Sequence, residues 1–343
     1  MIALIGDLHF GARNSSPVFH AYFEDVINDI FQTIKDKGIN SVIQLGDLFD
    51  NRTELSLFAW DSFNRAIIKN IRDLKNPKFK WYQLVGNHDS RYRETLSLNT
   101  PRLRLSEEPQ IMVIDKPIEV LIDNKQFLMI PWINKENKQE VFDLVKETEA
   151  EYCCGHFEFD GFDFAKGVPG KSNLSHKEFS KFKSVFSGHY HTFSTKDNIC
   201  YTGTPYELTW IDCDDPKGII LLDDSVEWEP TKKTIFSKIS YEQGMSVDPE
   251  LVQGKFVRLV VNGRPDKADY FRVVGEIESH KPIDLTIQEN FQDELAEETT
   301  SVKITETREV ILDYLNKSEV DLDKNRLMQI FDTLHMEALN DEG

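Results

Sequence analysis

The chain has 343 residues, of which 40% are hydrophobic and 29% are charged, and its formal net charge is −19 at pH 7. This length allows two or three domains with a substantial core. Because proteins that bind nucleic acid unaided usually carry a basic face, the acidic balance argues against a simple basic DNA-binding module. If the protein acts on DNA, metal ions, a local basic patch or a partner protein must help to neutralise phosphate.

The sequence also argues against secretion and membrane insertion. No apolar run approaches the ~20 residues that a membrane helix needs, and the start MIALIGDLHF lacks the length and basic flank of a signal peptide. The four cysteines, Cys153, Cys154, Cys200 and Cys213, have neither C-x-x-C nor zinc-site spacing. We therefore expect an intracellular protein with reduced, mostly buried thiols.

The first part of the chain alternates strands and helices. Apolar runs predict strands at 2–6, 41–46 and 81–86, and helical spacing of apolar residues predicts helices at 19–37 and 57–74. Each of these strands ends in glycine followed by polar residues. Because helices alternate with strands, we expect a sheet that is covered on both faces.

Strands dominate from about residue 111 to 230. They are predicted at 111–115, 118–123, 126–132, 151–156, 184–189, 198–204 and 218–224, with a turn at 123–125 and a helix at 137–147. A smaller α/β unit is predicted at 231–290, with strands at 255–263 and 283–288 and a helix at 266–279. An acidic linker at 291–304 precedes two short amphipathic helices, at 305–317 and 323–338.

Polar motifs follow the ends of five predicted strands. They are GDLH with Asp7 and His9, GDLFD with Asp47 and Asp50, GNHD with Asn87 and His88, CGH with His156, and SGHYH with His189 and His191. In doubly wound sheets ligands bind at the carboxyl ends of strands, so these side chains are expected to converge on one crevice. Carboxylate, amide and imidazole ligands without thiolates suit Mn²⁺, Fe²⁺ or Zn²⁺ in an open site.

Each motif alone has an ordinary structural explanation. A Gly-Asp pair after a strand is usually a turn, and GNHD fits a turn with a capping asparagine. A single histidine such as His156 after an apolar strand is more often a satisfied core residue than a ligand. The joint occurrence of five such motifs favours a metal centre in which one carboxylate bridges two ions.

This set resembles the calcineurin-like metallophosphoesterase superfamily, whose pattern is D-x-H, G-D-x-x-D, G-N-H-D/E, a single H and G-H-x-H. The resemblance implies a β-sandwich flanked by helices. It also implies two divalent ions, most simply Mn²⁺ with Mg²⁺ as the alternative. Carried over by position, one ion takes Asp7, His9 and His191, the other takes Asn87, His156 and His189, and Asp47 bridges them. His88 would be the free imidazole that protonates the leaving oxygen.

Within that superfamily the chain resembles the SbcD-like nuclease subunits of DNA double-strand-break repair, and especially the recombination nuclease subunits of T4-like bacteriophages. The early D-x-H motif and the segment YTGTPYELTWIDCDDPKGIILLD, 201–223, carry this likeness. It implies a 3′→5′ exonuclease and single-strand endonuclease that acts in recombination, repair or replication, in the cytoplasm of the host cell if the protein is phage-encoded.

The same resemblance implies an assembly and a domain order. The expected order is a nuclease domain at 1–230, a capping domain at 231–290, a linker at 291–304 and a helical module at 305–343. In the family, the nuclease subunit dimerises and its C-terminal helices bind an SMC-like ABC-type ATPase. A helical pair packed on its own domain is the alternative for the last segment, whose apolar stripes are too short to be stable alone.

Two positions depart from the family pattern. The cellular nucleases often have histidine where this chain has Asp50, whereas the superfamily's protein phosphatases have aspartate there, paired with the catalytic histidine. We therefore expect the Asp50 carboxylate to orient His88 and raise the His88 pKa. Asn51 and Arg52 replace the phosphatases' Arg-Gly and argue against a phosphatase. A phosphomonoesterase or protein phosphatase, and a non-catalytic assembly subunit, remain the alternatives.

Two further features concern phosphate. The segment AKGVPGKS, 165–172, fits a loose phosphate-loop pattern, but no helix is predicted after it, so a loop beside the substrate is favoured. Arg13, Arg91 and Arg93 directly follow the metal motifs. They are candidates for contacts with DNA phosphates, with solvated loop arginines as the alternative.

Overall fold

In the computed structural model, residues 1–165, 168–170, 172 and 174–290 are described, and Met1–Asn290 forms one compact unit. The predicted linker at 291–304 and helical module at 305–343 lie outside the described residues, as does part of the phosphate-loop-like segment 165–172. Among the described helices, none has the length and apolar character required to span a bilayer.

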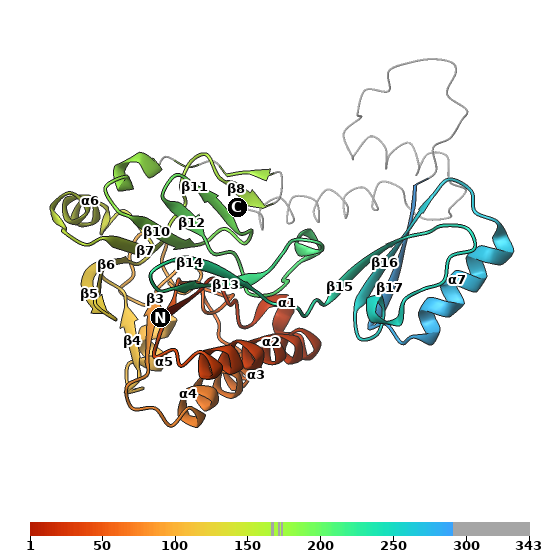
Figure 1. Ribbon diagram of the computed structural model, residues 1–343, viewed down its shortest axis with the longest axis horizontal. Coiled ribbons are helices and arrows are strands. Elements are labelled where there is room, and N and C mark those ends of the chain that lie inside the picture. The colour runs from red at the N-terminus through yellow and green to blue at the C-terminus, as the bar shows by residue number, and fades with distance from the viewer. Residues whose placement is uncertain (166–167, 171, 173, 291–343) are drawn as a thin grey trace, which may run out of the picture. The chain divides into compact units, whose positions relative to one another are not determined.

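The first of two six-stranded sheets has the strand order β14-β13-β1-β2-β3-β4 (Figure 1). Its strands are β1 Ile2–Ile5, β2 Ser41–Gln44, β3 Lys80–Leu84, β4 Ile111–Ile114, β13 Gly218–Leu222 and β14 Val226–Pro230. Strands β1 to β4 are parallel, whereas β13 and β14 are antiparallel. The predicted parallel arrangement of 2–6, 41–46 and 81–86 therefore lies at the centre of this sheet.

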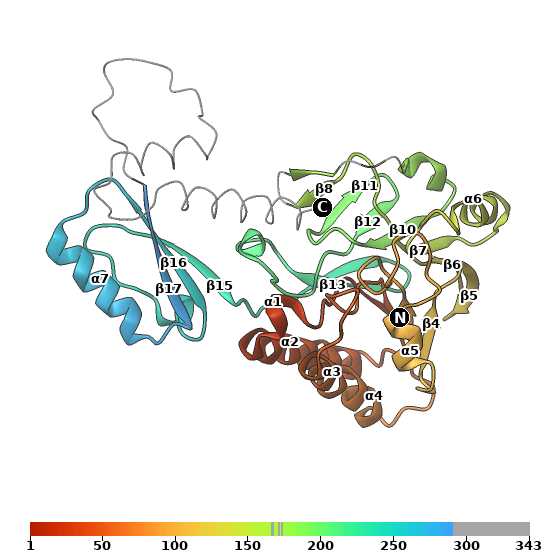
Figure 2. The same cartoon turned by 180° about the vertical axis from the view of Figure 1, so that it is seen from behind.

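Helices cover one face of this sheet (Figure 2). They are α1 Ala12–Ser15, α2 Pro17–Asp36, α3 Leu57–Phe63, α4 Lys69–Asp73 and α5 Thr100–Leu105. The helix predicted at 57–74 is interrupted by a π-helical turn at Asn64–Ile68, which joins α3 to α4. Helix α2 places Phe23, Ile27 and Ile34 at helical spacing in the core beneath it.

The second sheet has the order β11-β12-β10-β7-β6-β5. Its strands are β5 Ile118–Ile122, β6 Lys125–Ile130, β7 Tyr152–His156, β10 Ser184–Gly188, β11 Ser194–Lys196 and β12 Ile199–Tyr201. Residues 123 and 124 have positive φ in the predicted turn between β5 and β6. Helix α6 Lys138–Glu147 packs through Val141 and Val145 against the outer face of this sheet.

The inner faces of the two sheets pack together. Ile2, Leu4 and Ile43 of the first sheet share one core with Phe127 and Cys154 of the second. Each sheet is thus covered by helical elements on one face and by the other sheet on its other face. The implied β-sandwich flanked by helices is confirmed, and the first sheet is covered on both faces as expected, by helices on one side and by the second sheet on the other.

Residues 231–290 form a third, three-stranded parallel sheet. It contains β15 Phe236–Ser240, β16 Phe256–Asn262 and β17 Asp284–Asn290, with α7 Lys267–Ser279 between the last two. Its own core includes Val257, Leu259, Val273 and Ile277. The division at residue 230 stays a prediction, because this part and the sandwich belong to one compact unit.

Several short elements were not predicted from the sequence. They are α5, β11, β14, β15 and the two-stranded sheet of β8 Asp163–Ala165 and β9 Val168–Pro169. The four cysteines are free thiols, and Cys153, Cys154 and Cys200 are buried.

Candidate metal centre

The predicted ligands follow the carboxyl ends of parallel strands from both sheets. Asp7 and His9 follow β1, Asp47 and Asp50 follow β2, Asn87 and His88 follow β3, His156 ends β7, and His189 and His191 follow β10. Because the strands within each sheet point the same way there, their ends meet at a common edge. Residues that are distant in the chain, such as His9 and His191, 182 positions apart, therefore lie together at this edge.

One set of ligand atoms is formed by Asp7, His9 and His191. Nε2 of His9 lies 3.2 Å from Nε2 of His191, which in turn lies 3.6 Å from Oδ2 of Asp7. One ligand atom from each residue lies within 4.8 Å of the other two. Three lone-pair donors at such separations can share one cation.

A second set is formed by Asn87, His156 and His189 with Asp47. Oδ1 of Asn87 lies 2.9 Å from Nε2 of His156 and 3.1 Å from Nδ1 of His189. Oδ2 of Asp47 lies 3.2 Å from Nε2 of His156. The same Oδ2 lies 3.7 Å from Nε2 of His9 in the first set, so the Asp47 carboxylate stands between both sets.

Glycines allow the main chain to approach these carboxylates closely. A Cβ at Gly86 would lie 2.2 Å from Oδ1 of Asp47, and one at Gly188 would lie 2.4 Å from Oδ1 of Asp7. Since real Cβ atoms do not approach so closely, only glycine fits these two strand ends. The glycines of GNHD and SGHYH are therefore required by the geometry of the carboxylates.

Three of the predicted ligands have left-handed backbone conformations. The φ angles of His9, Asp47 and His189 are 44°, 52° and 84°. Such conformations cost a non-glycine residue on the order of 1–3 kcal/mol and cluster at functional sites. The strain is localised where side chains must turn towards a common point.

Further hydrogen bonds orient the ligand side chains. The His189 N–H donates to Oδ2 of Asp7 at 2.9 Å, and Nδ1 of His156 donates to the Leu45 carbonyl at 2.7 Å. The second bond leaves Nε2 of His156 facing the cluster. Bonds of this kind fix the tautomer and the ring orientation of a ligating histidine.

Burial and charge strongly perturb the acid–base properties of the site. Burial raises the pKa of Asp7 to about 7. For His9, burial opposes the charged form, but the contact with Asp50 and the charge of Asp47 outweigh it and raise the pKa to about 9. The pKa of His156 is raised to about 9 in the same way, against burial, by the charges of Asp47 and Asp7. The carboxylates thus stabilise the protonated, positively charged forms of His9 and His156.

The pKa values of the other two proposed histidine ligands are shifted in the opposite direction. Burial lowers the pKa of both His189 and His191 to about 3, assisted by the charges of His156 and His9 respectively. Both rings are therefore neutral at pH 7 and offer lone pairs. Neutral imidazoles beside carboxylates and an amide oxygen, with no thiolate among the converging groups, fit hard to borderline divalent cations.

His88 lies beside this cluster but is oriented differently from expectation. Its Nδ1 donates to the main-chain carbonyl of Asp50 at 2.6 Å. The carboxylate of Asp50 instead lies 3.2 Å from Nδ1 of His9. The predicted orientation of His88 by the Asp50 carboxylate is therefore wrong. Motif spacing could not separate these arrangements, because the main chain and the side chain of Asp50 point to different histidines.

The three candidate phosphate-binding arginines have different surroundings. Nε of Arg13 donates to the Leu208 carbonyl at 2.9 Å, and its guanidinium lies 5.5 Å from the ring of Phe19. Arg13 still lines the cavity of about 360 Å³ at the metal cluster, together with His88 and His191. Arg91 and Arg93 are exposed.

Sequence reasoning missed three residues beside the cluster. Arg52 is half-buried and its pKa is lowered, first by burial and then by the charge of Arg93. Trp132 packs its ring 5.1 Å from that of His189. Lys217 is buried and donates to the His191 carbonyl at 2.9 Å. Trp132 could have been found, since it follows β6, whose carboxyl end lies at the same edge as that of β7.

The chain is similar to known proteins. The model of the calcineurin-like phosphoesterase family matches residues 1–193, which contain all the predicted ligands and His88. The chain is also 29% identical to exonuclease subunit 1 of Enterobacteria phage T4 over 345 residues, covering 97% of this chain and 98% of that protein. The second likeness extends through 231–290 and the C-terminal segment.

Proposed function

The chain belongs to the calcineurin-like phosphoesterase family, and from this premise we propose that it is a metal-dependent DNA nuclease, the nuclease subunit of a recombination and repair complex. The near full-length likeness to an exonuclease subunit favours a phosphodiesterase over a phosphomonoesterase or a non-catalytic subunit. The proposed activities are 3′→5′ exonuclease and single-strand endonuclease.

The observation that carries this proposal is the position of the Asp47 carboxylate between two sets of ligand atoms. Asp7, His9 and His191 are proposed to hold one ion and Asn87, His156 and His189 the other, with Asp47 shared. When bound, two Mn²⁺ ions, or Mg²⁺ as the alternative, would stabilise charge on the phosphate oxygens and lower the pKa of the attacking water.

The residues of the chain supply positioning and proton transfer. His88 lines the cavity at the ligand cluster, and its Nδ1 is bound to the Asp50 carbonyl. This bond leaves Nε2 as the ring nitrogen that can donate a proton to the leaving oxygen. The Asp50 carboxylate contacts His9 and so acts on the ligand set.

We further propose a homodimer. Leu57 of α3 and Leu103 of α5 are 87% and 66% exposed, and the two helices are linked by the Arg104 guanidinium, 5.7 Å from the Trp60 ring. Exposed large apolar side chains on adjoining elements are typical of an interaction surface. A symmetric dimer buries the same surface on both copies.

The remaining proposals concern organisation and partners. They are a nuclease domain at 1–230, a capping domain at 231–290, a linker at 291–304, and a module at 305–343 that binds an SMC-like ABC-type ATPase. Nearly half of the net negative charge lies in 292–343, so a partner with a basic surface is electrostatically favourable. The complex would act in the cytoplasm, that of the host for a phage protein.

Digestion of end-labelled DNA tests the proposed function. Purified protein with Mn²⁺ should shorten a duplex labelled at the 5′ end and nick single-stranded circles, and chelation should abolish both reactions. Co-expression with the ATPase subunit should change the rate or the product length. Intact DNA under all of these conditions would contradict the proposal.

A further inference from the structure

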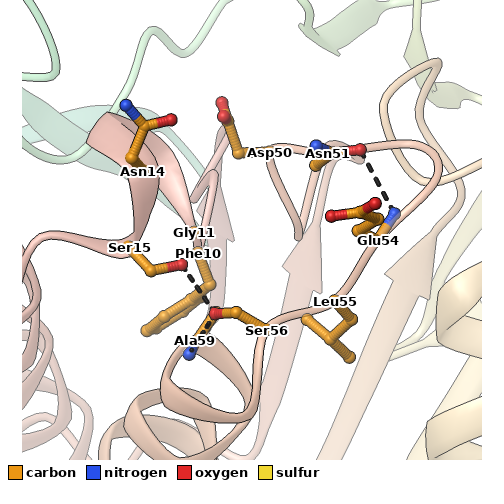
Figure 3. Close-up of a pocket in the computed structure, with 10 residues that line it drawn as sticks. All are labelled: Phe10, Gly11, Asn14, Ser15, Asp50, Asn51, Glu54, Leu55, Ser56 and Ala59. Carbon is orange, nitrogen blue, oxygen red and sulfur yellow. Dashed lines mark hydrogen bonds between the residues drawn. The ribbon is translucent and has the colours of Figure 1, made fainter.

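Two more cavities adjoin the metal cluster, one through its proposed ligand His156 and the other through Asp50, which contacts the proposed ligand His9. A cavity of about 600 Å³ includes Asp50 (Figure 3), and one of about 260 Å³ includes His156. A DNA strand whose phosphate lies at the cluster must pass its neighbouring nucleotides through the adjoining space. The two cavities are therefore candidate places for the nucleotide next to the cleaved bond.

The cavity beside Asp50 is unsuitable for phosphate. Figure 3 shows the carboxylates of Asp50 and Glu54 at its wall, with the amides of Asn14 and Asn51. Among the described residues that line it there is no lysine or arginine. Because like charges in a partly enclosed space repel, this cavity disfavours a second phosphate group.

The cavity beside His156 has the opposite character. Its wall carries Lys135 and Lys138, with Glu158 as the opposing charge, and the ring of Trp132. Among the described residues, Lys135 forms a long ion pair with Glu94, at 3.8 Å and with both side chains largely exposed. Such a pair is weak in water, so the ammonium group is free to bind phosphate.

Local hydrogen bonds hold the segment that carries these groups. Nδ2 of Asn137 donates to the Trp132 carbonyl at 3.0 Å, and Oδ1 of Asn137 accepts from the Asn134 N–H at 2.9 Å. Asn134 is 8% exposed, and its Nδ2 is buried without a hydrogen-bond partner among the described residues. Trp132 is further fixed by ring contacts with His156 and His189, at 5.9 Å and 5.1 Å.

We propose that the cavity lined by Trp132, Lys135 and Lys138 is a nucleotide subsite, which binds the DNA nucleotide adjacent to the scissile phosphate. The lysines bind its phosphate group, and Trp132 offers an aromatic surface for its base. Base–aromatic stacking with backbone neutralisation is the usual way to bind single strands without reading sequence. This inference rests on the proposed nuclease function and adds to it the path of the DNA strand beside the metal cluster.

The test compares a DNA strand with a diester that has no neighbouring nucleotide. The double variant Lys135→Gln/Lys138→Gln is assayed on a single-stranded oligonucleotide and on bis(p-nitrophenyl) phosphate, with Mn²⁺. We expect KM for the oligonucleotide to rise about tenfold and its salt dependence to weaken by roughly one unit of slope. The values for the small diester should stay within about twofold, since the metal cluster is untouched.

Two matched variants control for charge. Lys69→Gln/Lys78→Gln removes two exposed lysines that precede β3, at the end of the sheet away from the ligands, and should leave KM for the oligonucleotide unchanged. Glu54→Gln alters the other cavity and should not raise that KM. An unchanged KM in the Lys135/Lys138 variant would overturn the subsite, and so would equal losses on both substrates. Failure of the unmodified protein to cut DNA while it hydrolyses the small diester would instead overturn the proposed function.

Discussion

The main-chain N–H of His88 donates to Oδ1 of Asp47 at 2.8 Å. Asp47, which is proposed to bind both cations, thus also positions His88, which is proposed to transfer the proton. Since Oδ2 of Asp47 faces the ligand sets, its two oxygens divide these roles. A change at Asp47 should therefore disturb metal binding and the position of His88 together.

The two histidines of SGHYH should act on different ions. His191 lies with His9, at 3.2 Å, and His189 lies with Asn87, at 3.1 Å. Each single variant, His189→Ala or His191→Ala, should bind one Mn²⁺ instead of two, and the double variant should bind none at the same free concentration. Metal analysis after equilibrium dialysis measures this.

The double variant separates the alternatives. If both histidines bound the same ion, the double variant would retain one Mn²⁺ per chain. Circular dichroism of the three variants controls for the fold, because a loss of secondary structure would remove metal for another reason.

His88 and Asp50 should differ in their effect on turnover. His88→Gln should lower kcat about 10²–10⁴-fold while both ions stay bound, because a proton donor is lost and no ligand is removed. Asp50→Asn should have a smaller effect, because the Asp50 carbonyl still accepts from His88 and only the contact with His9 changes. Steady-state kinetics with metal analysis compares the two. An Asp50→Asn loss as large as that of His88→Gln would indicate that the carboxylate does orient His88 during turnover.

Metal binding should release protons. In the metal-free protein the pKa of His9 and that of His156 are each raised to about 9, so both rings carry a proton at pH 7 that a cation must displace. The affinity for Mn²⁺ should therefore increase as the pH is raised to about 9. Calorimetric titration in buffers of different ionisation enthalpy counts the released protons. No proton release at pH 7 would contradict the assigned protonation of these ligands.

Lys217 should be required for stability. Its Nζ donates to Asp212 at 2.7 Å and Asp215 at 2.8 Å, and to the carbonyl of His191 at 2.9 Å. Removing one partner of a buried ion pair typically costs 3–5 kcal/mol, because the other charge stays buried and unpaired. Lys217→Met should lower the free energy of unfolding by about this amount in urea titrations. A matched exposed change, Lys78→Met, should lower it by less than ~0.5 kcal/mol.

The proposed dimer surface can be tested without disturbing the core. Leu57 is 87% exposed, so Leu57→Asp should leave the fold intact while it places a charge in the interface. Light scattering should then report a monomer, where the unmodified protein gives a dimer. Equal masses for both proteins, whether monomeric or dimeric, would contradict the role of this surface.

Strand-end motifs predicted most of the site because parallel strands align their carboxyl ends. The residues after β1, β2 and β3 needed only this rule. Those at the ends of β7 and β10 also needed the second sheet to pack face to face with the first, with its carboxyl strand ends at the same edge. The β-sandwich itself did not follow from alternation. It depends on a core that Phe127 and Cys154 of the second sheet share with Ile2 of the first, which no local pattern encodes.

The errors arose where one residue offers two groups or where partners are distant in sequence. Asp50 presents a carbonyl to His88 and a carboxylate to His9, and spacing cannot distinguish them. The Leu208 carbonyl that accepts from Arg13 lies 195 positions away, so spacing could not reveal this contact, and the role of Arg13 at phosphate stays a prediction. The edge strands β11 and β14 lack the apolar run of a buried strand, since all of their residues are partly or fully exposed.

We propose that the site cleaves phosphodiester bonds of DNA with two metal ions. The most direct measurement is Mn²⁺-dependent hydrolysis of DNA beside that of p-nitrophenyl phosphate, by the unmodified protein and by Asp47→Asn. We expect rapid DNA cleavage and slow monoester turnover by the unmodified protein, and loss of DNA cleavage in the variant. Intact DNA with rapid turnover of the monoester would contradict it.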